Sequence, residues 1–372
     1  MSRPKIMFLR TSLIALVAAA TLIGCSDDAD DRQAATCELT LPPVGQYFDT
    51  LSEYCFFRGN LAAQTPSDGV VPYAVNTKLY SDHSSKLRFI VLPDGEKITF
   101  HETEMWEYPV GTTIVKTFYF PNDLREPEGA RHVVETRLMV REDNDWSTHT
   151  YLWNAEQTEA ASFLAGKNID ISYINETGES VDGHYRIPSK SDCRNCHASG
   201  SKTVLLGPRT RQLNRHEDFG DGPVNQITHY AELGMFDAEI PPVETLDKLI
   251  DPKDSSFPLE QRARTYLEGN CAHCHNSGGA ARNSGLFLAI DEVSPTALGV
   301  CKTPIAAGSG AGGLFYDIYP GKPEESIMVY RMDSMEAGVK MPELPLTTID
   351  HFGVDLITEW IAAMPGDCPP IN

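Results

Sequence analysis

Two five-residue segments of the chain carry cysteine and histidine in the order C-x-x-C-H: Cys193–His197 and Cys271–His275. Four chemistries use such residues: a zinc site, a redox dithiol, a disulfide and covalent haem attachment. Zinc sites gather four cysteine or histidine ligands in two close pairs, and a redox dithiol needs no histidine after its second cysteine. Haem attachment uses all three residues, because the thiols add to the porphyrin vinyl groups and the histidine binds the iron. Two copies in one chain favour this last chemistry.

The sequence therefore predicts two covalently bound haem c groups as cofactors. The predicted attachment cysteines and proximal iron ligands are Cys193, Cys196 and His197 for the first haem, and Cys271, Cys274 and His275 for the second. His273 lies between the second pair of cysteines and is expected to face solvent.

A methionine after the second motif is expected to supply the sixth iron ligand of the second haem. Met341 stands in the segment Lys340-Met341-Pro342, which resembles the distal-ligand region of class I cytochrome c domains. A thioether ligand raises the reduction potential of a haem. Three other methionines in this region stay open as alternatives: Met328, Met332 and Met335.

The sixth ligand of the first haem is less clearly marked, because no Met-Pro pair follows His197. Met235 and His229 both fall on a helix expected over 225–236, and either is predicted as the ligand. His216, in a polar loop, and an open sixth position are further alternatives.

The N-terminus has the pattern of an export signal. Arg3, Lys5 and Arg10 precede an apolar run over 11–23 that is too short for a convincing membrane span. Cys25 follows this run and ends the segment Leu22-Ile23-Gly24-Cys25, which resembles a bacterial lipobox. We expect a signal peptide over 1–24, a lipid anchor on Cys25 and an acidic tether over 25–39. The protein would then be held by lipid at the outer or inner membrane of the cell envelope, facing the periplasm or the cell exterior.

Four cysteines remain after the lipid anchor and the two motifs are assigned. An exported protein lies where disulfides persist, and an even remainder suits two bridges. The predicted pairs are Cys37–Cys55 and Cys301–Cys368, although other pairings stay open. Each bridge would add on the order of 3 kcal/mol to the free energy of unfolding.

The formal net charge of -21 bears on the choice of partner. So acidic a surface argues against nucleic acid or anionic lipid headgroups as partners, and it is compatible with a basic redox protein. No G-x-S-x-G, H-E-x-x-H or dinucleotide-binding loop supports hydrolase, metalloprotease or nicotinamide chemistry.

The elements that must position the motifs change character along the chain. Short runs rich in Val, Ile, Thr, Tyr and Phe, separated by turn formers, predict an antiparallel β-sandwich-like domain over 40–185. Its three tryptophans, Trp106, Trp146 and Trp153, are expected to pack in the core. Helical spacing after this region predicts a first haem domain over 186–250 and a second, cytochrome c-like domain over 251–372. The predicted fold class is α+β multidomain, with a mainly α haem region after the β domain.

Several segments together resemble a bacterial family of di-haem c-type cytochrome lipoproteins with an N-terminal β-rich domain. They are LYSDHSSKLRFIVLP, VGTTIVKTFYF, YRIPSKSDCRNCH, RTRQLNR and CAHCH with the later MPELP. The resemblance implies haem binding and electron transfer, and it implies no substrate.

We therefore expect an exported, lipid-anchored di-haem electron-transfer protein. An alternative is a di-haem peroxidase that reduces hydrogen peroxide, which needs an open distal site and a nearby acid–base group. A third possibility is a binding module whose β domain docks a partner.

Overall fold

The computed structural model describes residue 1, residues 37–344 and residues 346–370. Cys37–Asn372 forms one compact unit. The predicted signal peptide, the lipid-anchor residue Cys25 and most of the predicted tether lie outside the described residues. Among the helices of the described part, none has both the length and the apolar character to cross a bilayer.

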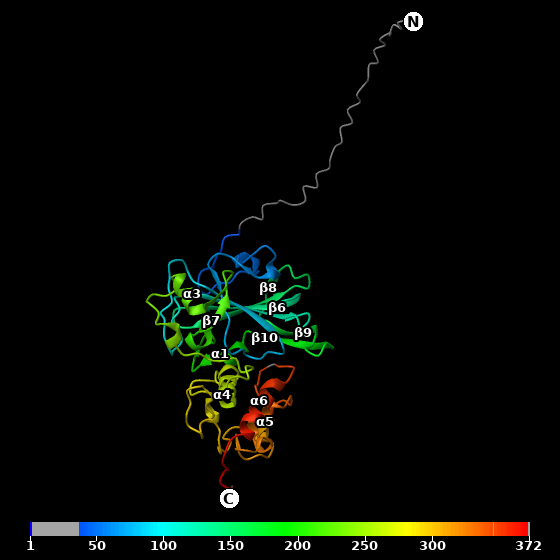
Figure 1. The fold of residues 1–372 in the computed structure, drawn as a ribbon, viewed down its shortest axis with the longest axis vertical. Coiled ribbons are helices and arrows are strands. Elements are labelled where there is room, and N and C mark those ends of the chain that lie inside the picture. The colour runs from blue at the N-terminus through cyan, green and yellow to red at the C-terminus, as the bar shows by residue number, and fades with distance from the viewer. Residues whose placement is uncertain (2–36, 345, 371–372) are drawn as a thin grey trace. The chain divides into compact units, whose positions relative to one another are not determined.

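A six-stranded antiparallel sheet forms the centre of the β-rich part, in the order β3-β4-β5-β6-β7-β8 (Figure 1). Its strands come from the runs of β-branched and aromatic residues, which fit a pleated, half-buried surface. The strands are β3 (Val70–Pro72), β4 (Ser85–Val91), β5 (Thr113–Pro121), β6 (Arg131–Arg141), β7 (Trp146–Trp153) and β8 (Ala160–Ser162).

Each face of this sheet carries its own apolar cluster, because alternate residues of a strand point to opposite faces. One face packs Phe89, Val115 and Leu138 against the N-terminal segment. The opposite face has two clusters, one at each end. The first contains Ile90, Ile114 and Met139, and the second contains Phe118 and Phe120.

A separate hairpin covers the Phe118 end of that second face. It consists of β9 (Ala165–Ile174) and β10 (Ser180–Ser189), paired antiparallel. Tyr185 and Ile187 of β10 pack against Phe118 and Phe120. Because β10 ends four residues before Cys193, the hairpin places the first C-x-x-C-H motif next to this face of the sheet.

The predicted fold class is wrong, because the region after residue 186 is not mainly α. Its six helices are short, and the two longest have 12 residues each. They are α1 (Cys193–His197), α2 (Thr210–Leu213), α3 (Gln226–Glu232), α4 (Leu259–Asn270), α5 (Ile327–Met332) and α6 (His351–Ala362). Among the described residues β-strand is more abundant than helix. Glycines and prolines between the helices favour turns, which limit helix length.

Small β hairpins occur where helix was expected. Their strands, together with the pair near the N-terminus, are β1 (Phe57–Arg58), β2 (Thr65–Pro66), β11 (Ala198–Ser199), β12 (Lys202–Thr203), β13 (His216–Asp218) and β14 (Pro223–Asn225). The β-rich part also differs from two facing sheets of similar size, because one large sheet is covered in part by a single hairpin.

Helices α4 and α6 pack against each other and form the third main cluster. Leu267 of α4 and Ile357 of α6 are both fully buried there. Gly353 allows the close approach, since a Cβ atom at this position would overlap the Tyr266 ring. The Tyr266 hydroxyl donates to Oδ2 of Asp350 at 2.9 Å, and Oδ1 of Asp350 accepts from the Gly353 amide at 3.2 Å. This packing fixes the end of α4, where the second motif begins.

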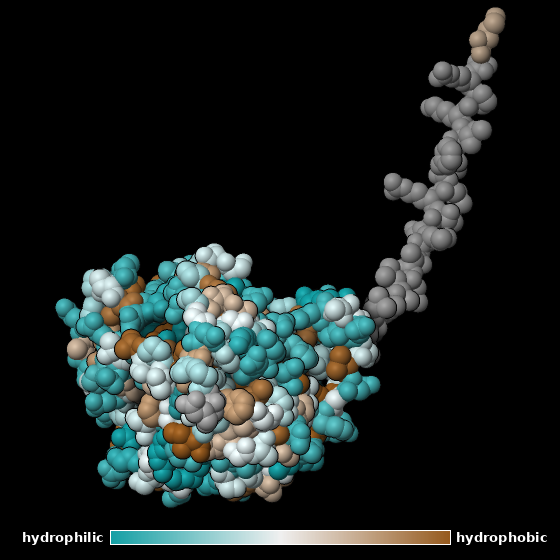
Figure 2. Space-filling view, turned by 90° about the horizontal axis from the view of Figure 1, so that it is seen from below, coloured by the Kyte–Doolittle hydropathy of each residue, from teal (hydrophilic) through white to brown (hydrophobic). Residues whose placement is uncertain are grey.

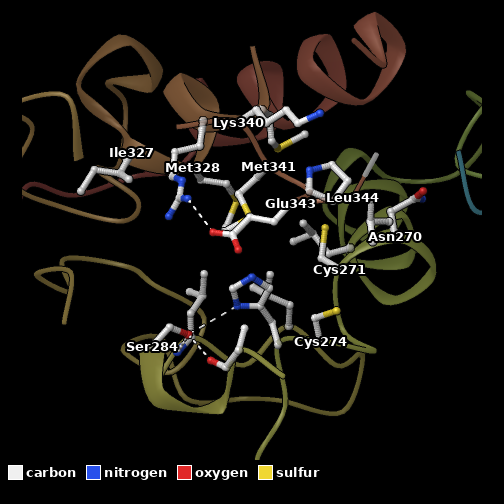
Figure 3. Close-up of a pocket in the computed structure, with 18 of the residues that line it drawn as sticks. Asn270, Cys271, Cys274, Ser284, Ile327, Met328, Lys340, Met341, Glu343 and Leu344 are labelled. Carbon is white, nitrogen blue, oxygen red and sulfur yellow. Dashed lines mark hydrogen bonds and ion pairs between the residues drawn. The ribbon is translucent and has the colours of Figure 1, made fainter. Parts of the chain in front are cut away.

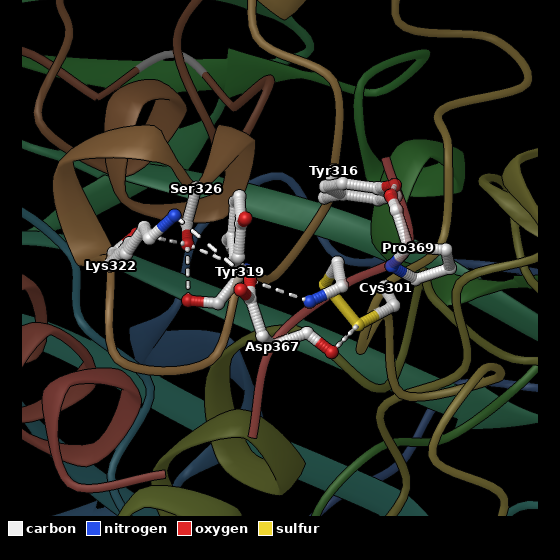
Figure 4. Close-up of a disulfide and its surroundings, with 8 residues drawn as sticks. Cys301, Tyr316, Tyr319, Lys322, Ser326, Asp367 and Pro369 are labelled. Atoms are coloured by element: carbon white, nitrogen blue, oxygen red, sulfur yellow. Dashed lines mark hydrogen bonds and ion pairs between the residues drawn. A yellow bond between two sulfur atoms is a disulfide. The ribbon is translucent and has the colours of Figure 1, made fainter. Parts of the chain in front are cut away.

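Two disulfides join Cys37 to Cys55 and Cys301 to Cys368, the same pairs that the cysteine count predicts. Figure 4 shows the second one, which ties the C-terminal segment to the loops beside α5. The Tyr316 hydroxyl donates to the Pro369 carbonyl next to it.

Candidate functional site

The second motif follows directly from the C-terminus of α4. The Cys271 amide donates to the Leu267 carbonyl at 2.9 Å, and the His275 amide donates to the Cys271 carbonyl at 3.0 Å. Cys271 and His275 therefore lie on one helical turn. Gly279 lets the chain fold back at once, because a Cβ atom there would overlap the Cys274 carbonyl.

A cavity of about 490 Å³ opens beside this motif (Figure 3). Its volume lies within the range of small-molecule and cofactor sites. Cys271, Cys274 and His275 border it from the motif, and apolar side chains of α4, α5, α6 and the connecting loops line much of the rest. These apolar residues are Leu267, Leu286, Leu288, Ile327 and Val354.

Methionines border the same cavity, and Met341 is one of them. Figure 3 shows Met341 and Met328 across the cavity from Cys274 and Ser284. The Met341 amide donates to the Arg331 carbonyl at 2.8 Å, which fixes this loop on the end of α5. Met332 and Met335 also line the cavity, so Met341 stays a predicted ligand with its alternatives.

The His275 imidazole is set up to act as a neutral ligand. Burial lowers its pKa to about 4. Nδ1 of His275 lies 3.5 Å from the Ser284 hydroxyl. A metal-ligating histidine often engages its other ring nitrogen in this way, which leaves Nε2 for the metal.

Charged side chains occur at the edge of this apolar cavity. Nζ of Lys302 lies 2.7 Å from Oδ2 of Asp317, and burial raises the pKa of Asp317. Arg331 donates to the Val339 carbonyl at 2.7 Å and pairs with Glu343 at 3.3 Å. The cavity therefore combines an apolar interior with two ion pairs at its edge.

The first motif forms α1, just after β10. Asp192 accepts hydrogen bonds from the amide and the hydroxyl of Ser189, at 2.8 and 2.7 Å, and these bonds lower the pKa of Asp192. Nδ1 of His197 is 2.9 Å from the Val204 carbonyl, so Nε2 faces elsewhere. Burial lowers the pKa of His197 to about 4. His197 is therefore a neutral imidazole with one nitrogen engaged, as His275 is.

The two motifs lie side by side, although 74 residues or more separate them in the sequence. The Cys274 thiol donates to the Asn195 carbonyl at 3.2 Å, and the Gly200 amide donates to the Gly278 carbonyl at 3.1 Å. The Cys196 and Cys274 thiols also interact, which raises the pKa of Cys196 and lowers that of Cys274. The sequence did not indicate this contact.

His273, which was expected to face solvent, lies between two cavities of the structure. It borders the cavity beside the second motif and also a second cavity of about 540 Å³. The second cavity is lined by the segments 198–199 and 202–206, by the loop residues 105–108 and by residues 144–146 at the start of β7. Met105 also lines this cavity and so places a thioether near the first motif. Nothing in the local sequence of Met105 indicates this position.

The two predicted distal ligands of the first haem have packing roles. Met235 is 6% exposed and belongs to the cluster of Ile90 and Ile114. The His229 ring stacks on the Phe219 ring with 3.9 Å between centroids. His216 pairs with Asn225 in the β13–β14 hairpin. The sixth ligand of the first haem stays a prediction.

Within the described residues, no group of three or more His, Cys, Asp or Glu side chains could hold a metal ion. A porphyrin iron with histidine and methionine ligands does not need such a group, because the porphyrin supplies its other ligands.

The chain matches no protein-family model, no curated protein sequence and no solved structure. The resemblance to di-haem cytochrome lipoproteins therefore stays a prediction from the sequence.

Proposed function

We propose that the protein is an exported di-haem c-type electron-transfer protein. The observation that supports this most directly is the second motif, whose three residues border an apolar cavity of about 490 Å³ with Met341 across it. A haem supplies one-electron chemistry when it is bound, and the protein sets its position and potential.

The side chains would divide the work as follows. Cys271 and Cys274 would hold the second haem by thioether bonds, and His275 and Met341 would supply the protein ligands of its iron. The apolar lining keeps water from the site, which favours the reduced state together with the thioether ligand.

The first haem would be attached at Cys193 and Cys196, with His197 as proximal ligand. The contact between the two motifs supports a relay, because electron transfer slows steeply with distance and neighbouring attachment sites bring two haems close. Asn195 and Cys274 lie at this contact.

The surface suits a transient partner. Ile305 and Met335 border the cavity and are 72% and 42% exposed, so a small apolar rim surrounds its opening. Figure 2 shows a mainly hydrophilic face with separate hydrophobic patches. A basic redox partner would complement the net charge of -21. A lipid on Cys25 would hold the protein at the membrane, in the cell envelope.

A haem count tests the proposal. Protein matured in a host with cytochrome c assembly should give two haems per chain in a pyridine haemochrome assay, and peptides containing each motif should carry the added mass. Replacing Cys271 and Cys274 by serine should leave one haem, and the matched change of Cys193 and Cys196 should also leave one. Protein without added tetrapyrrole at either motif would refute the proposal.

The same preparation separates an electron carrier from a peroxidase. The carrier should show two low-spin haems and no turnover when peroxide meets the half-reduced protein. Rapid turnover, or a high-spin first haem, would refute the carrier and favour the enzyme.

A further inference from the structure

A band of cations crosses the middle of one face of the six-stranded sheet. Strand register places the four side chains on the same face, since Arg88 is opposite Lys116 and Lys116 is opposite Arg137. Lys86 joins them from two residues before Arg88 on β4. We call Lys86, Arg88, Lys116 and Arg137 the cation face. It lies between the apolar cluster of Ile90 and Ile114 and the cluster of Phe118 and Phe120.

Three of these cations gather around one aromatic ring. The Phe118 centroid lies 5.8 Å from Nζ of Lys86, 5.0 Å from Nζ of Lys116 and 4.1 Å from the guanidinium carbon of Arg137. Such distances allow cation–π attraction, but they also hold the three like charges close together.

The face has too little negative charge for its four cations. Glu135 is fully buried, pairs with Arg137 at 2.5 Å and accepts from the Tyr185 hydroxyl at 2.7 Å. Lys86 donates to the Leu79 carbonyl at 2.8 Å. Among the described residues no carboxylate forms a salt bridge with Lys86, Arg88 or Lys116. Half-buried cations without a counter-charge are costly.

The pKa values of the two lysines reflect this cost. Burial lowers the pKa of Lys116 to about 7, and Arg88 and Arg137 lower it further. Burial also lowers the pKa of Lys86 well below its usual value, with Lys116 as the largest charged contributor. Lys86, Arg88 and Lys116 therefore lie close together without a carboxylate partner among the described residues.

The first motif borders this face. Tyr185 of β10 contacts both members of the Glu135–Arg137 pair, at 2.7 Å from Glu135 and 3.4 Å from Arg137. The connection is short, since Tyr185 contacts Glu135 and the chain then runs directly from β10 into α1.

We propose that the cation face binds the two propionate carboxylates of the first haem, with Lys116 and Lys86 as the main partners. This inference rests on the proposed function. Two carboxylates would supply the missing counter-charge. A haem attached at Cys193 and Cys196 would bring its propionates close to the cation face, because the first motif borders this face. Arg137 is already neutralised by Glu135 and would contribute less.

Reduction potentials of the fully matured protein test the assignment. Lys116→Met and Lys86→Met should each lower the potential of the first haem, because a nearby positive charge favours the reduced iron. Lys116→Arg keeps the charge and should restore the potential. The potential of the second haem, identified by its response to Met341→Ala, should stay unchanged in all three variants.

Lys167→Met, which removes an exposed cation from β9, is the matched control and should shift neither potential. The assignment is refuted if Lys116→Met and Lys86→Met hold two haems and leave the first potential where it was. A chain that carries no haem refutes the proposed function instead, and the haem count distinguishes the two failures.

A soluble dicarboxylate is the other source of this chemistry. Succinate added to the wild-type protein should leave the first potential unchanged, since the propionates already occupy the cations. A succinate-dependent shift that is lost in Lys116→Met would refute the assignment to propionates, because it would show a face open to external anions.

Discussion

At the scale of single residues, the second motif gives the most definite expectations. Two separate parts of the chain meet at the cavity: the motif, with the thiols of Cys271 and Cys274 and the buried imidazole of His275, and a later segment with a methionine across from them. The proposed haem site depends on the arrangement of these side chains around one apolar cavity and not on any one of them alone.

Met341→Ala should abolish the weak far-red absorption band of a ferric iron–methionine bond and should lower the potential of the second haem, because the thioether favours the reduced state. The visible spectrum and a potentiometric titration measure both effects. Met364→Ala is the matched control, since Met364 packs against the cluster of α4 and α6 but is not among the residues that line the cavity. Loss of the band in Met328→Ala, Met332→Ala or Met335→Ala, with Met341→Ala unaffected, would show that this other methionine is the ligand.

At the scale of elements, the crossing of α4 and α6 supports the site. The second motif begins where α4 ends, and α4 is positioned by its contact with α6 near Gly353. The Tyr266 hydroxyl on Asp350 links the two helices at the same place. A change at this crossing should therefore reach the motif through α4.

Gly353→Ala should lower the free energy of unfolding by about 1–3 kcal/mol, because the added methyl group overlaps the Tyr266 ring and forces the helices apart. Denaturant unfolding measures the change. Asp355→Ala lies on the exposed side of α6 and should change stability little. Equal stability of the two variants would mean that the helices separate without cost, contrary to this packing argument.

At the scale of the whole molecule, charge sets the choice of partner. The net charge of -21 should speed the encounter with a basic redox protein and slow the encounter with an acidic one. The effect acts over the Debye length, which is about 8 Å at physiological ionic strength.

Electron exchange with a small basic redox protein should slow as salt is added, and exchange with an acidic one should not slow. Stopped-flow spectroscopy over a series of salt concentrations measures both rates. A salt-independent rate with the basic partner would show that the acidic surface does not steer the encounter.

The sequence alone determined the features that depend on short spacing and on counting. The two C-x-x-C-H motifs are read from five adjacent residues each. The four cysteines that remain indicated two disulfides, and the structure confirmed the predicted pairs among the pairings left open. The strands of the β-rich region were visible because side chains alternate along a strand. The helices before Cys271 and at the C-terminus were visible because their apolar residues recur every three or four positions.

Only the tertiary structure decided the rest, because it depends on which distant segments meet. The predicted mainly α region was wrong because turns and small hairpins, set by glycine, proline and long-range contacts, replace helix over much of 186–350. Lys86, Lys116 and Arg137 look like solvent-facing strand residues until strand pairing puts them on one face. The contact of Asn195 with Cys274 likewise joins two motifs that no local pattern connects. The spacing of residues within a segment indicates which ligand that segment can bind. The tertiary packing determines which other segments lie next to it.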